Sequence, residues 1–217
     1  VLEAFPGSLK NAVLTGNPVR SSIADSQFSG ALLTGRKPRL LVVGGSLGAA
    51  VLNEQVPAAL ASMEPEQRPE VRHQTGLKLI DDARKAYSDA GVEVQLDAFI
   101  DDMAEAYQWA DLVLCRAGAL TVAELAATGV ASILVPYPYA VDDHQTSNAD
   151  YLVSVGAAVL LPQTELNASR LLELLQLLQQ PQQLLQMAQR ARERAMPDAA
   201  QQVAAHCIAA SGWREAA

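Results

Sequence analysis

Residues 40–48 read Leu-Leu-Val-Val-Gly-Gly-Ser-Leu-Gly, and this stretch decides the fold class. An apolar run that enters a glycine turn, ahead of a helical pattern, predicts a buried strand followed by a helix. Glycine lets the backbone approach a ligand closely, and the start of the helix offers unpaired N–H groups to an anion. A tight turn with no ligand would produce the same pattern.

The spacing within this turn argues against a dinucleotide site. The dinucleotide fingerprint requires G-x-G-x-x-G and an acidic residue about 20 positions further on, at the end of the next strand. Here the spacing is G-G-x-x-G, and the next strand runs into His73-Gln74-Thr75-Gly76, which contains no acid. We therefore expect neither a nicotinamide nor a flavin cofactor, and none of another kind.

Strand and helix patterns alternate along residues 1–166. Because the connections are short, they predict right-handed crossovers and a doubly wound α/β fold, a Rossmann-like domain with a parallel six-stranded sheet. The expected strands are 39–44, 70–74, 92–96, 111–115, 131–135 and 157–161, and the expected helices are 48–62, 76–89, 102–109, 119–128 and 143–155. A further strand pattern covers Val13-Leu14-Thr15.

The strand pattern stops at Asn167, and residues 167–217 are expected to form C-terminal helices. Leucines keep a helical spacing from Leu171 to Leu178. Pro181 and Pro197 are placed to begin a second and a third helix. We expect these helices to pack on the sheet or to reach across to another lobe.

A second strand–glycine–helix pattern runs from Leu112 to Glu124. In the helix, Val122, Leu125 and Ala126 share a packed face, which leaves Glu124 on a different face. A carboxylate there could accept hydrogen bonds from two vicinal ribose hydroxyls. The same residues also fit a capping box, Thr121-x-x-Glu124, and the spacing does not separate the two interpretations.

A third candidate segment begins at Pro136-Tyr137-Pro138 and leads through residues 142–148 into a helix. Gln145 and Asn148 lie in the first turn of that helix, at the carboxyl end of the preceding strand, where open α/β sheets bind ligands. An amide both donates and accepts, which suits a sugar hydroxyl. His144 fits a ligand role and an exposed position equally well, whereas His73 and His206 are interpreted as structural or solvated.

The composition excludes several classes of protein. Of 217 residues, 50% are hydrophobic and only 5% aromatic, which favours helices packed on parallel strands. The formal net charge of −8 argues against nucleic acid as a partner. The one dense basic cluster, Arg36-Lys37-Arg39, is interpreted as the solvated beginning of a strand.

Two cysteines, Cys115 and Cys207, are too few to suggest a disulfide framework and favour a reducing compartment. No apolar run approaches the roughly 20 residues that span a bilayer. The chain does not begin with methionine, and we expect it to be a piece of a longer protein.

Metal chemistry is not indicated. The sequence has neither a His-Glu-x-x-His motif nor a Cys/His cluster, and it has no phosphate loop of the G-x-x-x-x-G-K type. The acidic doublets Asp81-Asp82, Asp101-Asp102 and Asp142-Asp143 are interpreted as helix surface or N-caps.

Taken together, these motifs resemble the C-terminal half of the MurG family, which are GT-B glycosyltransferases of bacterial peptidoglycan synthesis. The resemblance covers nearly the whole chain. The blocks that carry it are Gly16-Asn17-Pro18-Val19-Arg20, Gly44 to Ala49, His73 to Gly76, Phe99-Ile100-Asp101-Asp102-Met103, Arg116 to Glu124, and Asp142 to Ala149.

The resemblance implies an inverting transfer of N-acetylglucosamine from UDP-GlcNAc to lipid I, giving lipid II, with this chain as the donor-binding lobe. It implies that Arg20 and Ser46 contact the diphosphate and that the main chain at Ile100 reads uracil. Glu124 would hold the ribose and Gln145 the sugar hydroxyls. The helix start at Ala119, Leu120 and Thr121 would face the phosphates. Val122 and Ala123 are further candidates for donor binding, and Gly45, Gly118, His144 and Asn148 are secondary candidates.

The family's N-terminal lobe, which binds the acceptor and is thought to supply the base, has no match here. The catalytic base is therefore expected outside this chain, and so is the contact with the cytoplasmic face of the inner membrane, where the enzyme would be peripheral. Two alternatives stay open: a non-catalytic nucleotide-sugar-binding subunit of a split transferase, and a lobe like that of UDP-GlcNAc 2-epimerase.

Overall fold

The computed structural model describes residues 1–7, 9–26, 35–140 and 143–211. Within these ranges, six parallel strands form one sheet in the order β5-β4-β3-β6-β7-β8. The strands are β3 (Arg39–Val43), β4 (Glu70–Gln74), β5 (Gln95–Asp97), β6 (Leu112–Cys115), β7 (Ala131–Leu134) and β8 (Ala158–Leu160). The predicted doubly wound, six-stranded parallel sheet is confirmed.

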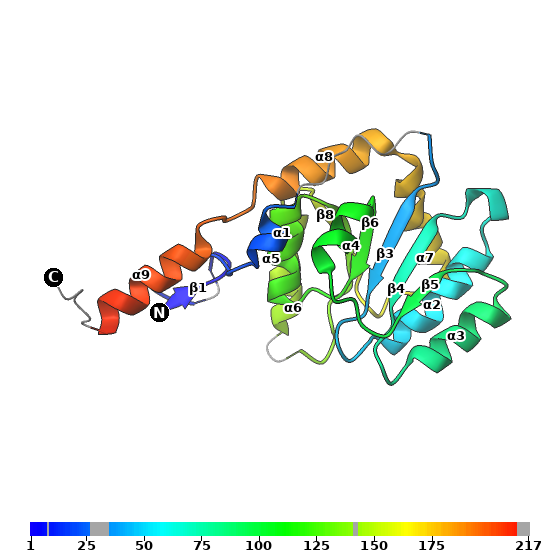
Figure 1. Cartoon of the computed structure of the whole chain (residues 1–217), viewed down its shortest axis with the longest axis horizontal. Helices are drawn as coiled ribbons and strands as arrows, with labels where there is room; N and C mark the ends of the chain where they lie inside the picture. The colour runs from blue at the N-terminus through cyan, green and yellow to red at the C-terminus, as the bar shows by residue number, and fades with distance from the viewer. Residues whose placement is uncertain (8, 27–34, 141–142, 212–217) are drawn as a thin grey trace.

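Helices cover both faces of the sheet (Figure 1). One face carries α2 (Ala50–Ala61), α3 (Ile80–Asp89) and α7 (Ala168–Leu175), and the other carries α1 (Ser21–Ala24), α4 (Met103–Trp109), α5 (Ala119–Thr128) and α6 (His144–Val153). Each face has its own apolar core, because alternate strand residues such as Leu40 and Leu41 point to opposite sides. The result is a three-layer α/β/α domain.

Strand β5 begins later than the sequence pattern suggested. We expected residues 92–96, but β5 spans Gln95–Asp97. Val92 instead ends the preceding helix: its N–H donates to the Tyr87 carbonyl, and the Gly91 N–H donates to the Ser88 carbonyl, with Gly91 at φ 62°. This arrangement is a Schellman motif, which uses a left-handed glycine to satisfy the last helical carbonyls. The apolar Val92 is therefore buried as part of a helix end.

The C-terminal helices divide into two groups. After α7, the 3₁₀ turn Gln176–Gln179 and α8 (Pro181–Arg192) pack on the domain, and Pro181 occupies the first turn of α8 as expected. By contrast, α9 (Ala199–Ser211) extends away from the sheet (Figure 1). Near the N-terminus, β1 (Leu2–Glu3) pairs with β2 (Val13–Leu14). Most of α9 is exposed. The division of the chain at residue 166 stays a prediction.

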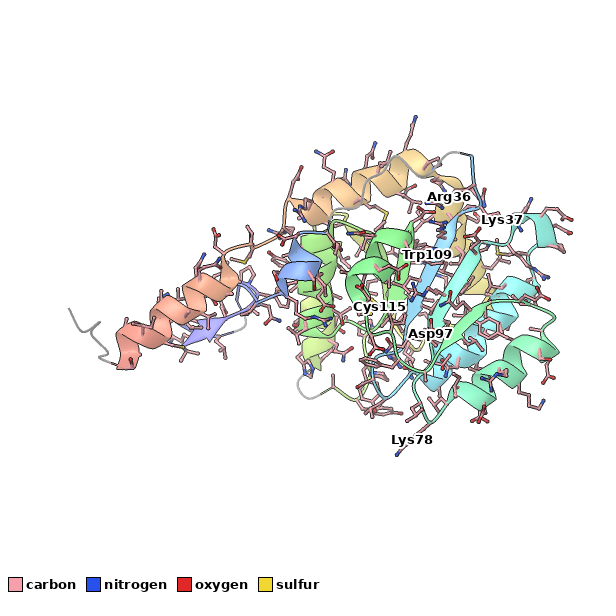
Figure 2. The ribbon with its side chains drawn as sticks, viewed as in Figure 1. Arg36, Lys37, Lys78, Asp97, Trp109 and Cys115 are labelled. Atoms are coloured by element: carbon pink, nitrogen blue, oxygen red, sulfur yellow. The ribbon has the colours of Figure 1, made fainter. Side chains whose placement is uncertain are left out.

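The basic cluster at residues 36–39 is not simply solvated, contrary to the expectation from sequence. Both terminal nitrogens of Arg36 donate to the two carboxylate oxygens of Asp111 at 2.7 Å, and Asp111 is only 1% exposed. The Arg39 N–H donates to the same carboxylate at 2.8 Å. Figure 2 shows Arg36 and Lys37 at the end of the sheet opposite Lys78. These bonds fix the beginning of β3 against the beginning of β6, at the end of the sheet where the strands start.

His73 is a core residue, as expected. Its side chain is fully buried on β4, and Nδ1 lies 2.8 Å from the Tyr87 hydroxyl. Burial lowers the pKa of His73 from 6.5 to about 3. The folded protein therefore keeps this imidazole neutral at a pH where the unfolded chain already binds a proton.

This difference predicts an acid-sensitive fold. Because the folded pKa lies below the unfolded one, the stability due to neutral His73 is present above pH 6.5 and is lost as the pH falls towards 3. The contribution of His73 to the free energy of unfolding is expected to fall by up to about 1.4 kcal/mol per pH unit in this window. Urea unfolding at several pH values measures it.

The variant His73→Gln, which cannot titrate there, is expected to show a shallower slope of stability against pH than the wild type. His206→Gln, on the exposed surface of α9, is the matched control and should keep the wild-type slope. Identical slopes for wild type and His73→Gln would show that His73 is not the titrating group.

Candidate functional site

Two strand-to-helix turns meet where the order of strands reverses. The chain leaves β3 towards β4 on one side, and later returns to place β6 on the other side of β3. The turn after β3 and the turn after β6 therefore lie next to each other at the carboxyl ends of the central strands. This switch point is where open α/β sheets bind their ligands.

The first turn depends on glycine because the backbone is crowded there. Gly48 has φ 77°, and a Cβ on it would lie 2.1 Å from the Thr75 carbonyl oxygen. No side chain fits at such a distance, so the turn can pass directly beside the end of β4. This close approach leaves Gly45 and Ser46 on the open side of the turn, where they line a cleft.

The cleft has a volume of about 570 Å³ and lies between the two turns. Five of the candidate donor-binding residues line it: Gly45, Ser46, Gly118, Thr121 and Gln145. The lining also includes Arg116, Tyr137 and Gln163, which follow β6, β7 and β8 in the chain. The sequence motifs after β3, β6 and β7 are thus brought together, although they are far apart along the chain.

The second turn presents the start of α5 to this cleft. Gly118 is the N-cap and provides no side-chain cap, and the first intrahelical bond runs from the Val122 N–H to the Gly118 carbonyl. The N–H groups of Ala119, Leu120 and Thr121 therefore precede the helical ladder. Such groups, together with the helix dipole, form a site suited to an anion.

The capping-box interpretation of Thr121 and Glu124 is wrong. A capping box requires Thr121 to be the N-cap, but α5 begins two residues earlier, at Ala119. The Glu124 carboxylate instead accepts a hydrogen bond from the Tyr107 hydroxyl on α4 at 2.9 Å. The position of this carboxylate is therefore set by another helix and is independent of a cap.

Glu124, on α5, and Arg20, just before α1, face each other but do not line the cleft. The Arg20 guanidinium lies 4.0 Å from Glu124 Oε1, and the two side chains are 61% and 17% exposed. Burial raises the pKa of Glu124, while the bond from Tyr107 and the charge of Arg20 lower it. The sequence had not predicted that Arg20 and Glu124 pair.

Other candidates have structural contacts of their own. The Gln145 amide oxygen accepts from the Tyr137 N–H at 2.9 Å, so it holds the loop that borders the cleft. The Asn148 side-chain amide donates to the Ala117 carbonyl at 3.1 Å and so stabilises the turn between β6 and α5. His144 is exposed at the start of α6 and does not line the cleft. Asp142 falls outside the described residues.

Val122, Ala123 and Ile100 contribute more to packing than to the cleft. Val122 is fully buried in the core, and Ala123 lines a small apolar cavity on the side of Phe5 and Tyr151. Ile100 is 3% exposed, and its N–H donates to the Gln74 side-chain oxygen at 3.3 Å. Gln74 also accepts, through its main-chain carbonyl, from the Gly44 N–H at 3.1 Å.

Gln74 thus connects the first turn with the Ile100 segment, and sequence reasoning had not given it this role. The signal was visible, because Gln74 is a polar residue at the carboxyl end of a buried strand. Arg116 was also missed. Its guanidinium donates to the Val135 and Pro136 carbonyls and to Gln163, and it stacks 5.5 Å from the Tyr137 ring centre. These contacts fix Arg116 relative to Tyr137 and Gln163 in the lining of the cleft.

The doublets Asp81-Asp82 and Asp101-Asp102 contribute helix surface and a helix cap, respectively. Asp102 is the N-cap of α4 and accepts from the Glu105 N–H at 2.9 Å, and Asp81 and Asp82 lie in the first turn of α3. Among the described residues, no three acidic, histidine or cysteine side chains converge as a metal site would require. None of the described helices combines the length and apolarity needed to cross a membrane.

Comparison with known proteins finds the same domain elsewhere. Residues 39–203 match the model of the glycosyltransferase family 28 C-terminal domain. The chain is 52% identical over 217 residues to the UDP-N-acetylglucosamine–N-acetylmuramyl-(pentapeptide) pyrophosphoryl-undecaprenol N-acetylglucosamine transferase of Marinobacter nauticus, covering 97% of this chain and 60% of that protein. The protein of the same name from Burkholderia mallei is 53% identical over 218 residues, with 98% and 59% covered.

The fold of a solved relative agrees. The crystal structure of Acinetobacter baumannii MurG superposes with a TM-score of 0.80 at 40% identity, covering 94% of this chain and 58% of that one. The chain therefore spans about 60% of the length of the curated relatives that it matches.

Proposed function

Because this chain belongs to glycosyltransferase family 28, with residues 39–203 as its C-terminal domain, we propose that it binds the sugar donor UDP-N-acetylglucosamine. The observation that carries the proposal is the cleft between the two turns. One wall offers Ser46, and the opposite wall offers the uncapped start of α5. Both suit a diphosphate, and the Glu124 carboxylate beside them suits the two hydroxyls of a ribose.

The same arrangement supports a sugar transfer with UDP as the leaving group. The 4-hydroxyl of N-acetylmuramic acid attacks the anomeric carbon of N-acetylglucosamine with inversion, and the bond from that carbon to the diphosphate breaks. The electron pair leaves with UDP. The first N–H groups of α5, with Arg20 and Ser46, stabilise this growing charge, and one well-placed donor of this kind is typically worth about 3 kcal/mol.

The acceptor side of the reaction lies beyond this chain in the proposal. The names of the relatives specify a lipid-linked N-acetylmuramyl-pentapeptide acceptor. We propose lipid I as the acceptor here as well, with the base that takes the hydroxyl proton supplied by another lobe. Action on lipid I places the enzyme at the cytoplasmic face of the inner membrane, as a peripheral protein of peptidoglycan synthesis.

Calorimetric titration of the chain with nucleotides tests the donor assignment. UDP and UDP-N-acetylglucosamine are expected to bind at least tenfold more tightly than ADP or GDP, because the resemblance to the MurG family implies that the main chain at Ile100 reads the uracil edge. UMP is expected to bind more weakly than UDP, because it lacks the second phosphate that the start of α5 would hold. Each tenfold difference in the dissociation constant corresponds to about 1.4 kcal/mol of binding free energy.

Two results would contradict parts of this proposal separately. Equal affinity for UDP and ADP would remove the uridine assignment while leaving a diphosphate site. Equal affinity for UMP and UDP would show that the start of α5 and Ser46 do not hold the second phosphate.

A further inference from the structure

The Tyr107 hydroxyl is a buried polar group that the proposed donor contacts leave without a role. Tyr107 lies on α4 and is 1% exposed. Its hydroxyl donates to Glu124 Oε2 at 2.9 Å. The ring belongs to the apolar core of this face of the sheet, so it cannot move without disturbing that packing. The hydroxyl is therefore a fixed point against which the carboxylate is placed.

The two oxygens of Glu124 have different neighbours. Oε2 is tied to Tyr107 on the inner side, whereas Oε1 faces Arg20 at 4.0 Å on the more open side. The terminal torsion of a glutamate is soft, so a carboxylate without such a partner samples a broad range of orientations. One short bond to a rigid ring selects a single orientation. A carboxylate oxygen has two acceptor positions, so Oε2 can accept from Tyr107 and still accept from a ligand.

Among the residues that the structure describes, three titratable groups interact with Glu124 from the surrounding elements. Tyr107 comes from α4, Arg20 precedes α1, and Cys115 ends β6. Burial raises the pKa of the Cys115 thiol to about 12 and raises the pKa of Tyr107 well above its usual value, so both are neutral at physiological pH. Burial raises the pKa of Glu124 as well, and the bond from Tyr107 acts in the opposite direction. Loss of this hydroxyl would therefore make Glu124 easier to protonate.

We propose that Tyr107 is a positioning residue for ribose recognition: its buried hydroxyl holds the Glu124 carboxylate in the orientation that accepts the ribose hydroxyls of the donor. The inference rests on the proposed function, because it assumes that Glu124 contacts the nucleotide. Tyr107 itself touches no ligand in this assignment. Because Tyr107 acts only through Glu124, its effect on nucleotide binding should depend on the presence of the Glu124 carboxylate.

The variant Tyr107→Phe keeps the ring and removes only the hydroxyl. Calorimetry at neutral pH is expected to show UDP binding about three- to tenfold weaker, since a pre-organised acceptor has been lost. The wild type should prefer UDP to 2′-deoxy-UDP, and the variant should lose part of this preference. UDP affinity should also begin to fall at a higher pH in the variant, because its Glu124 protonates more readily.

Tyr87→Phe is the matched control. Tyr87 is also buried, at 2% exposed, and its hydroxyl has an equally short contact, 2.8 Å to His73, but it lies on α3 away from the cleft. Both variants are expected to lower the midpoint of thermal unfolding. Only Tyr107→Phe should change UDP affinity, ribose preference and the pH at which binding is lost.

A double-mutant cycle with Glu124→Ala, which removes the acceptor altogether, separates this role from an effect on stability. If Tyr107 acts through the carboxylate, the effect of Tyr107→Phe on UDP affinity should be much smaller in the Glu124→Ala background. Fully additive effects, or wild-type affinity and pH dependence in Tyr107→Phe, would overturn the positioning role. If Glu124→Ala itself left UDP affinity and ribose preference unchanged, the proposed contact of Glu124 with the nucleotide would fail first.

Discussion

Replacing Glu124 with alanine is expected to weaken UDP binding by at least tenfold. The carboxylate lies beside the start of α5, with one oxygen held by Tyr107 and the other facing Arg20. Hydrogen bonds to a charged group contribute roughly 1.5–3 kcal/mol each, and the proposed ribose contact has two of them. Calorimetric titration with UDP measures the loss, and Glu124→Gln, which keeps the shape and one acceptor, should fall between alanine and wild type.

Discrimination against 2′-deoxy-UDP provides a second readout of Glu124. The wild type should prefer the ribonucleotide, and Glu124→Ala should bind both forms about equally. Alanine also leaves the buried Tyr107 hydroxyl without its acceptor, so some stability is expected to be lost. Glu124→Gln can still accept from Tyr107, which separates affinity from stability. Persistent ribose preference in Glu124→Ala would mean that another residue reads the 2′-hydroxyl.

Asp111→Ala is expected to have the largest effect on stability. The carboxylate is almost fully buried and accepts from Arg36 twice and from the Arg39 N–H. Removing one partner of a buried pair leaves the other charge without compensation, which typically costs about 3–5 kcal/mol. Urea unfolding measures the change in free energy. The protein that remains folded should bind UDP normally, because Asp111 precedes β6 whereas the cleft follows it.

The matched control is Asp81→Ala. Asp81 pairs with Arg84 on the surface of α3, where its side chain is 89% exposed. Solvent screens such a pair, so the free energy of unfolding should be almost unchanged. A loss in Asp111→Ala no larger than that in Asp81→Ala would show that the Arg36–Asp111 pair does not hold the two strand starts together.

The parts of the fold that the sequence predicted are those encoded locally. Apolar runs mark five of the six strands of the large sheet to within one residue at each end, and β4 coincides with its predicted range. The late start of β5 escaped prediction because Val92 has the same apolar character in a strand and in a helix end. The conformation of Gly91 decides between the two, and that is set by the carbonyls of α3.

The site was predictable to the extent that main-chain groups form it. Glycine turns and helix starts have a sequence pattern, so Ser46, Gly118 and Thr121 were identified and do line the cleft. The side-chain partners were not identified, because Tyr107 and Glu124 lie on different helices and no periodicity relates them. The pair of Arg36 and Asp111 was not predicted for the same reason, because the two residues are 75 positions apart in the sequence.

The place of β3 and β6 at the centre of the sheet also has a kinetic consequence. The strands before the reversal, β3 to β5, and those after it, β6 to β8, can each associate with near neighbours in the chain. The β3–β6 pair joins the two halves across a long sequence separation, a contact of high contact order and hence slow to form. Neither half alone has both walls of the cleft. If the cleft binds a nucleotide as proposed, it binds only molecules in which β3 and β6 have paired. The ligand then slows net unfolding and stabilises the folded state, but it does not speed the formation of the β3–β6 pair.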